Sequence, residues 1–535
     1  MTLRTIALTT TLLTTCVSIS PAAAVTCGGT LLVTSNQNSG AGSLREAIAQ
    51  ANACAGSEHP AEIHFTIAGT GVQTIYLSSP LPAIVHKTVL DGTKMHGHSG
   101  SPLVMIRGDF AGSANGLELR APGCHVKGLI VSRFRGAGIW IEAPDAVVEG
   151  CWVGTESDGT RGAANAAGVW IENVAGARIG GTEATKRNVL SGNSGAGIVM
   201  NGSGARSNLV EGNFIGTDYT GTKSCSNGDG VRLINGASSN VIGGHDPGSH
   251  NVISGNTLGN GVSIGSFSFP SGTPQTGNVV HGNRIGTDAD GLNRVSNNVG
   301  VFLYQTAGTT IGGASLQQGN LISGNYAQAV QVCSSTGVVI QGNTIGLSSA
   351  GSPLGTQASP GVDLNCGTNT DVLIGGTEHG AGNIIASSAR DGVLMAGGAR
   401  LRVRANSIFD NGDFGIHQFD AVNVAPVLES VTVHSLESTI IQGFLEASSG
   451  FAGATYALDF FSNQACDTYP GPGEGKTYLG STSVTLDADG LAAFSFHHSL
   501  PVHSEHVVTA TATRDGGSTS KFSNCASVEA LQKRR

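Results

Sequence analysis

Short apolar stretches alternate with polar positions along most of the chain, and glycine, asparagine, aspartate or serine interrupts each of them. The alternation runs over four or five positions at a time, which is typical of β-strands separated by turns. A Gly-aliphatic-x-aliphatic strand recurs, mostly at intervals of 29 to 33 residues, and each interval holds three short strands, for example 169–171, 178–180 and 189–191. The pattern predicts one triangular coil per interval. The strand begins at Gly116, Gly138, Gly168, Gly197, Gly230, Gly261, Gly300, Ala329, Gly361, Gly392 and Gly415.

A longer internal repeat supports this interpretation. An Ile-Gly-Gly element begins at Ile179, Ile242, Ile311 and Ile374, with spacings of 63, 69 and 63 residues. An Asn-x-x-Ser-Gly-Asn element begins nine residues after each of the first three. Repeats of this regularity indicate a solenoid. We therefore expect an all-β chain wound into a parallel β-helix, with two coils in each repeat.

Stacked coils place equivalent residues about 4.8 Å apart along the axis. Alternate aliphatic residues, such as Val169 and Ile171, then form inward columns that fill the core. Asparagines that follow glycine are expected at one bend, where their amides bond from coil to coil. This predicted asparagine ladder consists of Asn193, Asn213, Asn256, Asn283, Asn325 and Asn343.

The glycine-asparagine bends resemble those of the right-handed parallel β-helix proteins of the pectate-lyase-like superfamily. The resemblance covers roughly residues 61–420. Gly42-Ser-Leu-Arg-Glu-Ala-Ile48 is similar to a segment that opens secreted bacterial repeat proteins of this kind. The resemblance implies a right-handed coil. It does not select an activity, because the superfamily includes lyases, hydrolases, epimerases, adhesins and phage-tail proteins.

The N-terminal segments have their own signals. Residues 1–24 combine Arg4, an uncharged stretch and three alanines, which predicts a signal peptide cleaved near Ala24 and export to the medium or the bacterial cell surface. Residues 25–60 are expected to cap the solenoid with a strand over 31–34 and a helix. Ser43 and Glu46 form a capping box at the start of that helix.

The glycine-asparagine repeats end near residue 420, where the β-helix (61–420) is expected to stop. Residues 425–530 contain strand-like segments that predict a β-sandwich, and this segment resembles the immunoglobulin-like domains that often follow such repeats. The expected strands cover 431–433, 439–444, 456–461, 477–486, 492–496 and 507–512.

Nine cysteines remain after the signal peptide, in a compartment that permits disulfides. Cys27 with Cys54 would clip the N-terminal segment, and Cys466 with Cys525 would bracket the C-terminal one. No Cys-x-x-Cys or similar ligand spacing occurs, so we expect no metal site and no cofactor. The pairing stays open for Cys124, Cys151, Cys225, Cys333 and Cys366.

The composition and charge of the chain limit the kinds of partner that it can bind. The 535 residues include 80 glycines, only 12% are charged, and the formal net charge is −9, which excludes a nucleic-acid module and a charge-driven disordered chain. No apolar run after the first 24 residues approaches the roughly 20 residues that span a bilayer, so we expect no membrane insertion. We expect a monomer that binds a polysaccharide or a surface glycan.

Two outward rows of the recurring strand carry the candidate chemistry. Trp140 and Trp170 occupy neighbouring coils of the first row, and exposed aromatic rings beside carboxylates are how proteins hold sugars. The first row is Glu118, Trp140, Trp170, Val199, Arg232, Ser263, Phe302, Gln331, Asp363, Leu394 and His417. The second is Arg120, Glu142, Glu172, Asn201, Ile234, Gly265, Tyr304, Cys333, Asn365, Ala396 and Phe419. The expected substrate-binding residues are Trp140, Trp170, Glu118, Arg120, Arg232, Phe302, Tyr304, Asp363 and Asn365.

Glu142 and Glu172 are the candidate catalytic pair. One coil apart, they would lie about 5 Å from each other, close to the separation of acid and nucleophile in retaining glycosidases. The alternative interpretation is an ordinary surface pair partnered by Arg120. The pair favours a polysaccharide-binding or polysaccharide-degrading protein, with glycoside hydrolysis as the reaction.

Other functions stay open. The solenoid can be a spacer in a non-catalytic surface adhesin or structural repeat protein. A polysaccharide lyase or epimerase needs a base beside acidic groups, which Asp363, Asn365 and His417 offer, whereas Arg232 lies four coils from Asp363. The acidic loop residues Glu156, Asp218 and Asp288 suggest calcium, but they recur too far apart to share one ion, and turn hydrogen bonds explain them better.

Overall fold

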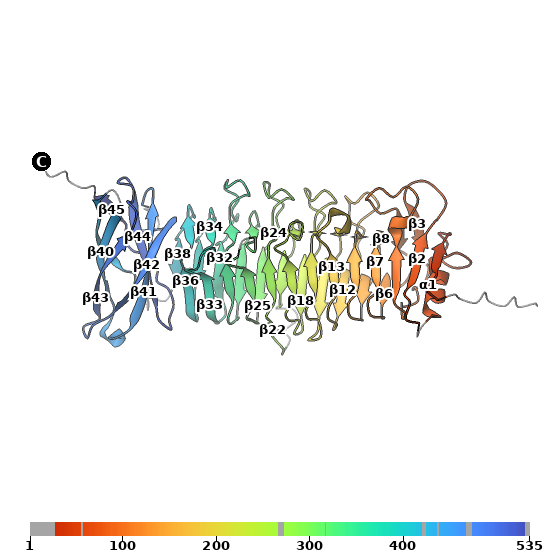
Figure 1. Cartoon of the computed structure of the whole chain (residues 1–535), viewed down its shortest axis with the longest axis horizontal. Helices are drawn as coiled ribbons and strands as arrows, with labels where there is room; N and C mark the ends of the chain where they lie inside the picture. The colour runs from red at the N-terminus through yellow and green to blue at the C-terminus, as the bar shows by residue number, and fades with distance from the viewer. Residues whose placement is uncertain are drawn as a thin grey trace, which may run out of the picture.

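The computed structural model describes residues 27–54, 57–265, 272–315, 317–419, 424–435, 438–466 and 473–529. Figure 1 shows a long rod of stacked strands, with helix α1 (Leu44–Asn52) at one end and a further β-domain at the other. Three parallel sheets build the rod, and the chain visits them in turn, so that one strand from each forms a coil. The fold is a right-handed parallel β-helix, as the sequence predicts. The expected signal peptide, 1–24, lies outside the described residues.

The first sheet contains 13 strands among the described residues, and it includes the most N-terminal strand of the rod. Its strands stack in register, for example through Val148 opposite Ile179. They are β1 (Thr30–Val33), β2 (Ala61–Phe65), β4 (Thr88–Asp91), β7 (His125–Lys127), β10 (Val147–Glu149), β13 (Arg178–Gly180), β16 (Leu209–Glu211), β19 (Val241–Gly243), β23 (Val279–His281), β27 (Thr310–Gly312), β30 (Val339–Gln341), β33 (Asn369–Gly375) and β36 (Gly398–Arg404).

The second sheet has 12 strands in the described ranges, several of them only two residues long. They are β3 (Gln73–Tyr76), β5 (Val104–Arg107), β8 (Leu129–Ser132), β11 (Trp152–Val153), β14 (Val189–Leu190), β17 (Phe214–Ile215), β20 (Val252–Ile253), β24 (Arg284–Ile285), β28 (Leu321–Ile322), β31 (Thr344–Ile345), β34 (Ile384–Ala386) and β37 (Ser407–Phe409). Two outlying strands, β22 (Gln275–Thr276) and β26 (Thr306–Ala307), pair with each other. Short 3-10 turns cover η1 (Gly92–Lys94) and η2 (Ala184–Lys186).

The third sheet corresponds to the recurring strand of the sequence pattern, and 11 of its strands lie in the described part of the chain. They are β6 (Leu117–Leu119), β9 (Ala137–Ile141), β12 (Ala167–Glu172), β15 (Ile198–Asn201), β18 (Val231–Ile234), β21 (Val262–Ile264), β25 (Val301–Tyr304), β29 (Val330–Cys333), β32 (Val362–Cys366), β35 (Val393–Met395) and β38 (Ile416–Gln418). The inward aliphatics of these strands, Val169, Ile171 and Leu233 among them, are fully buried in one continuous core. The core columns are those expected from the alternation.

The second residue of each Ile-Gly-Gly element ends a strand of the first sheet in a left-handed conformation. Gly180 has φ +94° and Gly243 has φ +96°. A Cβ on either glycine would lie 1.9 Å from a carbonyl oxygen of the next coil. Only glycine fits such a position, which explains why the element recurs in step with the coils.

Buried asparagines bond from coil to coil, but they form two main ladders rather than the single one expected. The glycine-asparagine sequence occurs at two different bends, so the predicted set divides between them. One ladder consists of Asn165, Asn193, Asn227, Asn256, Asn297 and Asn325. The other consists of Asn188, Asn213, Asn251, Asn283, Asn320, Asn343, Asn383 and Asn406. Coils that lack the glycine still supply an asparagine, as Asn227 does.

Helix α1 closes the N-terminal end of the core. The Ser43 hydroxyl caps it by accepting from the N–H of Glu46 at 3.3 Å, and the Glu46 carboxylate accepts from the N–H of Gly42 at 2.7 Å. Leu44 and Ile48 are fully buried in the core of the first coils. The predicted serine cap and buried helix face are confirmed, whereas Glu46 bonds the N–H of Gly42 and not that of Ser43, which donates to the carbonyl of Gly40.

The C-terminal β-domain is one seven-stranded sheet among the described residues, and its two outermost strands, β42 and β43, contact each other. The sheet thus curls around its own hydrophobic core. The strands are β39 (Val427–Ser435), β40 (Ser438–Glu446), β41 (Thr455–Asn463), β42 (Thr477–Thr485), β43 (Leu491–His498), β44 (Val507–Arg514) and β45 (Ala526–Glu529), with a 3-10 turn η3 (Ser449–Phe451). All six expected strands are present, and β45 was not anticipated.

This domain docks onto the open edges of the last coil. Thr519 N–H donates to the carbonyl of Leu401 at 3.0 Å, and Gly475 exchanges two 2.8 Å backbone hydrogen bonds with Ile408. The buried carboxylate of Asp459 accepts two hydrogen bonds from Arg404, with Nη2 at 2.8 Å from Oδ1. Sheet edges that would otherwise be exposed are thereby covered.

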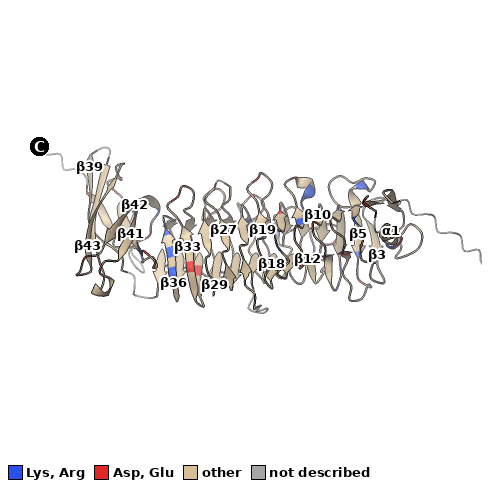
Figure 2. Cartoon of the chain, turned by 60° about the horizontal axis from the view of Figure 1, so that its bottom comes forward, with Lys and Arg blue, Asp and Glu red and all other residues tan. Residues whose placement is uncertain are grey.

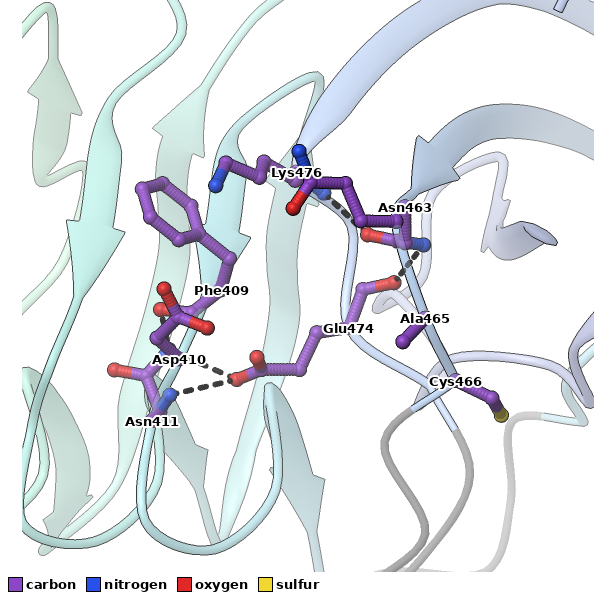
Figure 3. A pocket seen from close by; sticks show the side chains of 9 residues that line it. Phe409, Asp410, Asn411, Asn463, Ala465, Cys466, Glu474 and Lys476 are labelled. Carbon is purple, nitrogen blue, oxygen red and sulfur yellow. Dashed lines mark hydrogen bonds between the residues drawn. The ribbon is translucent and has the colours of Figure 1, made fainter. Parts of the chain in front are cut away.

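A pocket of about 450 Å³ lies at this junction (Figure 3). Glu474 extends across it and accepts from the Asn411 side-chain amide at 3.0 Å, as the next asparagine of a ladder would. The Lys476 ammonium lies 4.3 Å from the centroid of the Phe409 ring. The groups in the pocket therefore hold the two parts of the chain together.

The described cysteines form three disulfides. Cys27–Cys54 and Cys466–Cys525 are the pairs expected from the sequence, and Cys333–Cys366 joins two neighbouring coils. The remaining described cysteines, Cys124, Cys151 and Cys225, are buried thiols. Burial raises the pKa of Cys151 to about 12 and that of Cys225 to about 11, so both thiols stay protonated.

Candidate functional site

The outward face of the third sheet carries the predicted rows, and its strands are in register there. In the second row, Asn201 lies between Glu172 and Ile234, and Tyr304 lies beside Cys333. The first row pairs directly from strand to strand through Glu118, Trp140, Trp170, Val199, Arg232, Ser263, Phe302, Gln331, Asp363, Leu394 and His417. Residues far apart in the sequence are thus about 4.8 Å apart along the rod.

The second row is interrupted at β32. Cys333 pairs with Cys366 and not with Asn365, because the register shifts at this point and β32 accommodates an extra residue. The disulfide between Cys333 and Cys366 joins the two strands at the shift. Asn365 instead is exposed, with its N–H donating to Asp363 at 2.8 Å. Its predicted place in the row is therefore wrong.

The expectation that both rows face solvent is also wrong for several positions. The buried members are Val199, Ser263, Phe302, Asp363, Ile234, Gly265 and Cys333. Val199 and Ile234 form a small apolar cluster against which Trp140 and Trp170 pack. Phe302 forms another with Cys333 and half-buried Tyr304. Large side chains in adjacent coils cover their smaller neighbours, an effect that strand alternation alone does not show.

Trp140 and Trp170 stack on each other. Their ring centroids are 5.2 Å apart and their planes differ by 9°. Each indole therefore covers one face of the other, and both rings are half-buried. This arrangement leaves less ring surface for a sugar than two separate rings would offer.

Acidic residues surround the stacked indoles and are held by donors. Arg120 bridges Glu142, with Nε at 2.6 Å from Oε2, and Glu118, with Nη2 at 3.0 Å from Oε2. Glu172 accepts from the Trp170 indole N–H at 2.6 Å and from the Asn201 amide at 2.8 Å. These contacts fix the orientation of the Trp170 indole and satisfy the carboxylates within the protein.

A shallow groove of about 420 Å³ lies further along the same face, beginning at the coil after Trp170. Residues of the strands β18, β21, β25 and β29 line it, and Ser194 and Gly195 line it from the turn before β15, so it spans five coils, roughly 19 Å along the rod. Leu258 is 91% exposed on its wall. The groove is also lined by Asp229, Arg232, Asn260, Asn298, Phe302 and Gln331.

The polar groups of the groove fall into two kinds. The charged groups pair with each other, since Arg232 Nε lies 2.7 Å from Asp229 Oδ2. The amide side chains of Asn260, Asn298 and Gln331, in contrast, make no hydrogen bond to any described residue, and all three are half-exposed. Neutral donors and acceptors are therefore the polar groups that the groove offers to a ligand.

The C-terminal end of the face holds a histidine and a buried carboxyl group. His417 Nδ1 lies 3.2 Å from Asp391 Oδ1, and burial raises the pKa of Asp391. The His417 ring contacts Phe419, which is exposed, at a centroid distance of 4.5 Å. Asp363, two coils away in the row, accepts from Gln328 at 2.9 Å. His417 lies three coils beyond Gln331, so the pair of His417 and Asp391 is separate from the groove.

The acidic loops on the second sheet have internal partners. Asp218 accepts from the N–H groups of Thr222 and Lys223, and Asp288 is held in the same way in its own loop. Glu156 instead pairs with Arg107 at 3.2 Å. Within the described ranges, no three histidine, cysteine, aspartate or glutamate side chains are placed to hold a metal ion. Turn hydrogen bonds thus account for both aspartates.

Most residues that line the groove are not among the substrate-binding residues expected from the sequence. Asp229 and Asn260 immediately precede the glycines of two recurring strands, so reading that column coil by coil finds them. Leu258 and Asn298 lie on turns whose lengths vary between coils, and no periodic signal marks them.

No helix in the described part of the chain is long and apolar enough to cross a membrane.

No protein-family model matches the chain, and no curated protein matches its sequence. Solved structures do align with it. The A-module of mannuronan C-5 epimerase AlgE6 from Azotobacter vinelandii is 14% identical, with 72% of this chain and 93% of that chain covered and a TM-score of 0.43. The A-module of the same organism's epimerase AlgE4 is also 14% identical, with 72% and 89% covered and a TM-score of 0.37.

The enzymatically active domain of tailspike protein 2 of bacteriophage CBA120 is 12% identical. The alignment covers 86% of this chain and 71% of that domain, with a TM-score of 0.34. Because these TM-scores are all below 0.5, the description of the fold and of the site rests on the geometry of this chain alone.

Proposed function

We propose that this protein is an exported polysaccharide-binding β-helix, and that the groove across β15 to β29 is its binding site. The observation that carries the proposal is the groove itself. It runs along the rod across five coils, is shallow and open, and combines amides with an exposed leucine. An extended polymer fits such a site better than a compact ligand, because the groove has length without enclosure. The disulfides support export, since disulfides persist in oxidising compartments.

Truncating Leu258 tests the groove. We expect Leu258→Ala to lower affinity for a retained polysaccharide roughly three- to tenfold, because the apolar contact of a leucine side chain is lost. Native electrophoresis in gels that contain a panel of polysaccharides measures the affinity as retardation. Leu500→Ala is the matched control, since Leu500 is an exposed leucine on the C-terminal domain. Equal retardation of the wild type and Leu258→Ala would contradict the assignment of the groove.

Hydrolysis by Glu142 and Glu172 is the second candidate function. It is favoured by the register, which places the two residues on neighbouring coils directly after the paired Ile141 and Ile171. Binding without turnover is better supported, because Glu172 is hydrogen-bonded to the Trp170 indole and Glu142 is paired with Arg120. A retaining hydrolase needs one of the two to deliver a proton.

The double substitution Glu142→Gln and Glu172→Gln separates the two functions. We expect the wild type to bind a polysaccharide without releasing reducing ends, and the double variant to bind it equally well. Reducing-end assays on each retained polysaccharide make the measurement. Wild-type turnover that falls by about 100-fold or more in the double variant would instead assign the pair as catalytic.

A further inference from the structure

The groove contains no net charge that could attract an acidic polymer. Arg232, the cation on its floor, is engaged by Asp229, whose carboxylate is largely buried and also accepts from the N–H of Asn260 at 2.8 Å. An anionic sugar would have to compete with an ion pair that is already formed, and it would approach Asp229 as well. The charges of Arg232 and Asp229 therefore neutralise each other within the protein, and neither is left to pair with a charged ligand.

The rest of the face is acidic. The two rows contain the carboxylates of Glu118, Glu142, Glu172 and Asp363, and their two arginines, Arg120 and Arg232, are both paired with carboxylates. In Figure 2 the strands between β12 and β29 are mostly tan, whereas at the far end of the rod blue on β36 lies beside red on β33, and both of these strands belong to the first sheet. A polyuronate that lay along the groove would therefore extend toward the carboxylates of Glu118, Glu142 and Glu172 at its N-terminal end.

The groups that remain available in the groove are neutral. The amides of Asn260, Asn298 and Gln331 lack hydrogen-bond partners among the described residues, whereas the ladder asparagines are bonded on both sides. An amide offers two donors and one acceptor oxygen, which suits sugar hydroxyls that donate and accept in turn. The amides in the groove can therefore form hydrogen bonds with the hydroxyl groups of a neutral sugar.

Building on the proposed function, we infer that the groove binds a neutral polysaccharide and discriminates against uronic-acid polymers. Asn298 and Gln331 recognise hydroxyl groups, and the Asp229–Arg232 pair keeps the floor of the groove electrically neutral. Affinity is then nearly independent of ionic strength, because no ion pair forms between protein and ligand.

The test compares neutral and acidic polymers in the same assay. Full-length mature protein is run in native gels that contain dextran, mannan or hydroxyethyl cellulose, and in gels that contain alginate or polygalacturonate. We expect retardation by at least one neutral polymer, unchanged up to about 1 M NaCl, where the screening length is about 3 Å. We expect none by the two polyuronates.

The double variant Asn298→Ala and Gln331→Ala tests the two amides. Each lost hydrogen bond is expected to lower the affinity for the neutral polymer about two- to tenfold. Gln50→Ala, which removes a half-exposed amide from helix α1, is the control and is expected to bind as the wild type does. Wild-type retardation of the double variant would overturn the role of the amides.

The outcomes separate this inference from the proposed function. Retardation by the polyuronates alone, weakened steeply by salt, overturns the inference and leaves a polysaccharide-binding protein. Retardation by none of the polymers overturns the proposed function itself. Thermal unfolding of each variant shows whether a loss of binding reflects loss of the fold.

Discussion

Replacing Asp459 with alanine is expected to destabilise the junction between the β-helix and the C-terminal domain by about 3 to 5 kcal/mol. The Asp459 side chain is fully buried and accepts two hydrogen bonds from Arg404, at 2.5 and 2.8 Å. Removing the carboxylate leaves the guanidinium in a largely buried position without its counter-charge. Calorimetric unfolding, which resolves separate transitions in a chain of two parts, measures the effect.

Two further variants serve as controls for the Asp459→Ala experiment. Arg404→Met with Asp459→Leu replaces the whole pair by apolar side chains of similar size, and it is expected to recover most of the stability. Asp371→Ala breaks the exposed pair of Asp371 with Arg400 on the neighbouring strand, and it is expected to change the unfolding little. An unfolding profile of Asp459→Ala that matches the wild type would show that the buried pair does not hold the junction.

The coil positions could be predicted from the sequence because each coil repeats the same local chemistry. Strand alternation, the glycine of the Ile-Gly-Gly element and the spacing of the strands together fix where Val169 and Ile171 point. The register of the first row follows directly, from Glu118 to His417. In a solenoid, neighbours in space are neighbours in the repeat, so a one-dimensional pattern contains the stacking.

Two kinds of feature could not be predicted in this way. One arises where two different bends have the same local sequence, and the other where a coil departs from the regular repeat. Asn193 and Asn213 both follow glycine, yet they belong to different ladders, because the same dipeptide satisfies the backbone at either bend. Asn365 was misplaced because the extra residue in β32 shifts the register only locally. Local insertions leave no trace in a periodicity.

The candidate site shows the same division. Trp170, Arg232 and Phe302 were placed on the correct face by periodicity. The groove, however, depends on which turns rise beside the sheet, and its exposed wall residue Leu258 lies on such a turn. Whether a polar side chain is satisfied or available, as for Asn283 and Asn298, is decided by contacts that only the folded chain reveals.

That contrast leads to the second large effect, which concerns the interior of a ladder. Asn283→Leu is expected to cost roughly 3 kcal/mol or more, because it leaves several buried groups without partners. The Asn283 amide donates to Asn320 at 3.0 Å and to the carbonyl of Ile242 at 2.8 Å, and its oxygen accepts from Asn251 at 2.9 Å. Leucine has a similar size, so the loss reflects hydrogen bonds and not a cavity.

The matched substitution is Asn298→Leu, 15 residues further along the chain. This half-exposed side chain has no hydrogen-bond partner among the described residues, so its replacement is expected to leave the unfolding temperature near that of the wild type. Calorimetry on both variants makes the comparison, and native electrophoresis tests their binding. Asn283→Leu should lose stability, whereas Asn298→Leu should lose affinity at full stability. Equal stability of the two would show that the coil-to-coil amide bonds contribute no more than an exposed amide does, and the ladder would then not be what holds successive coils in register.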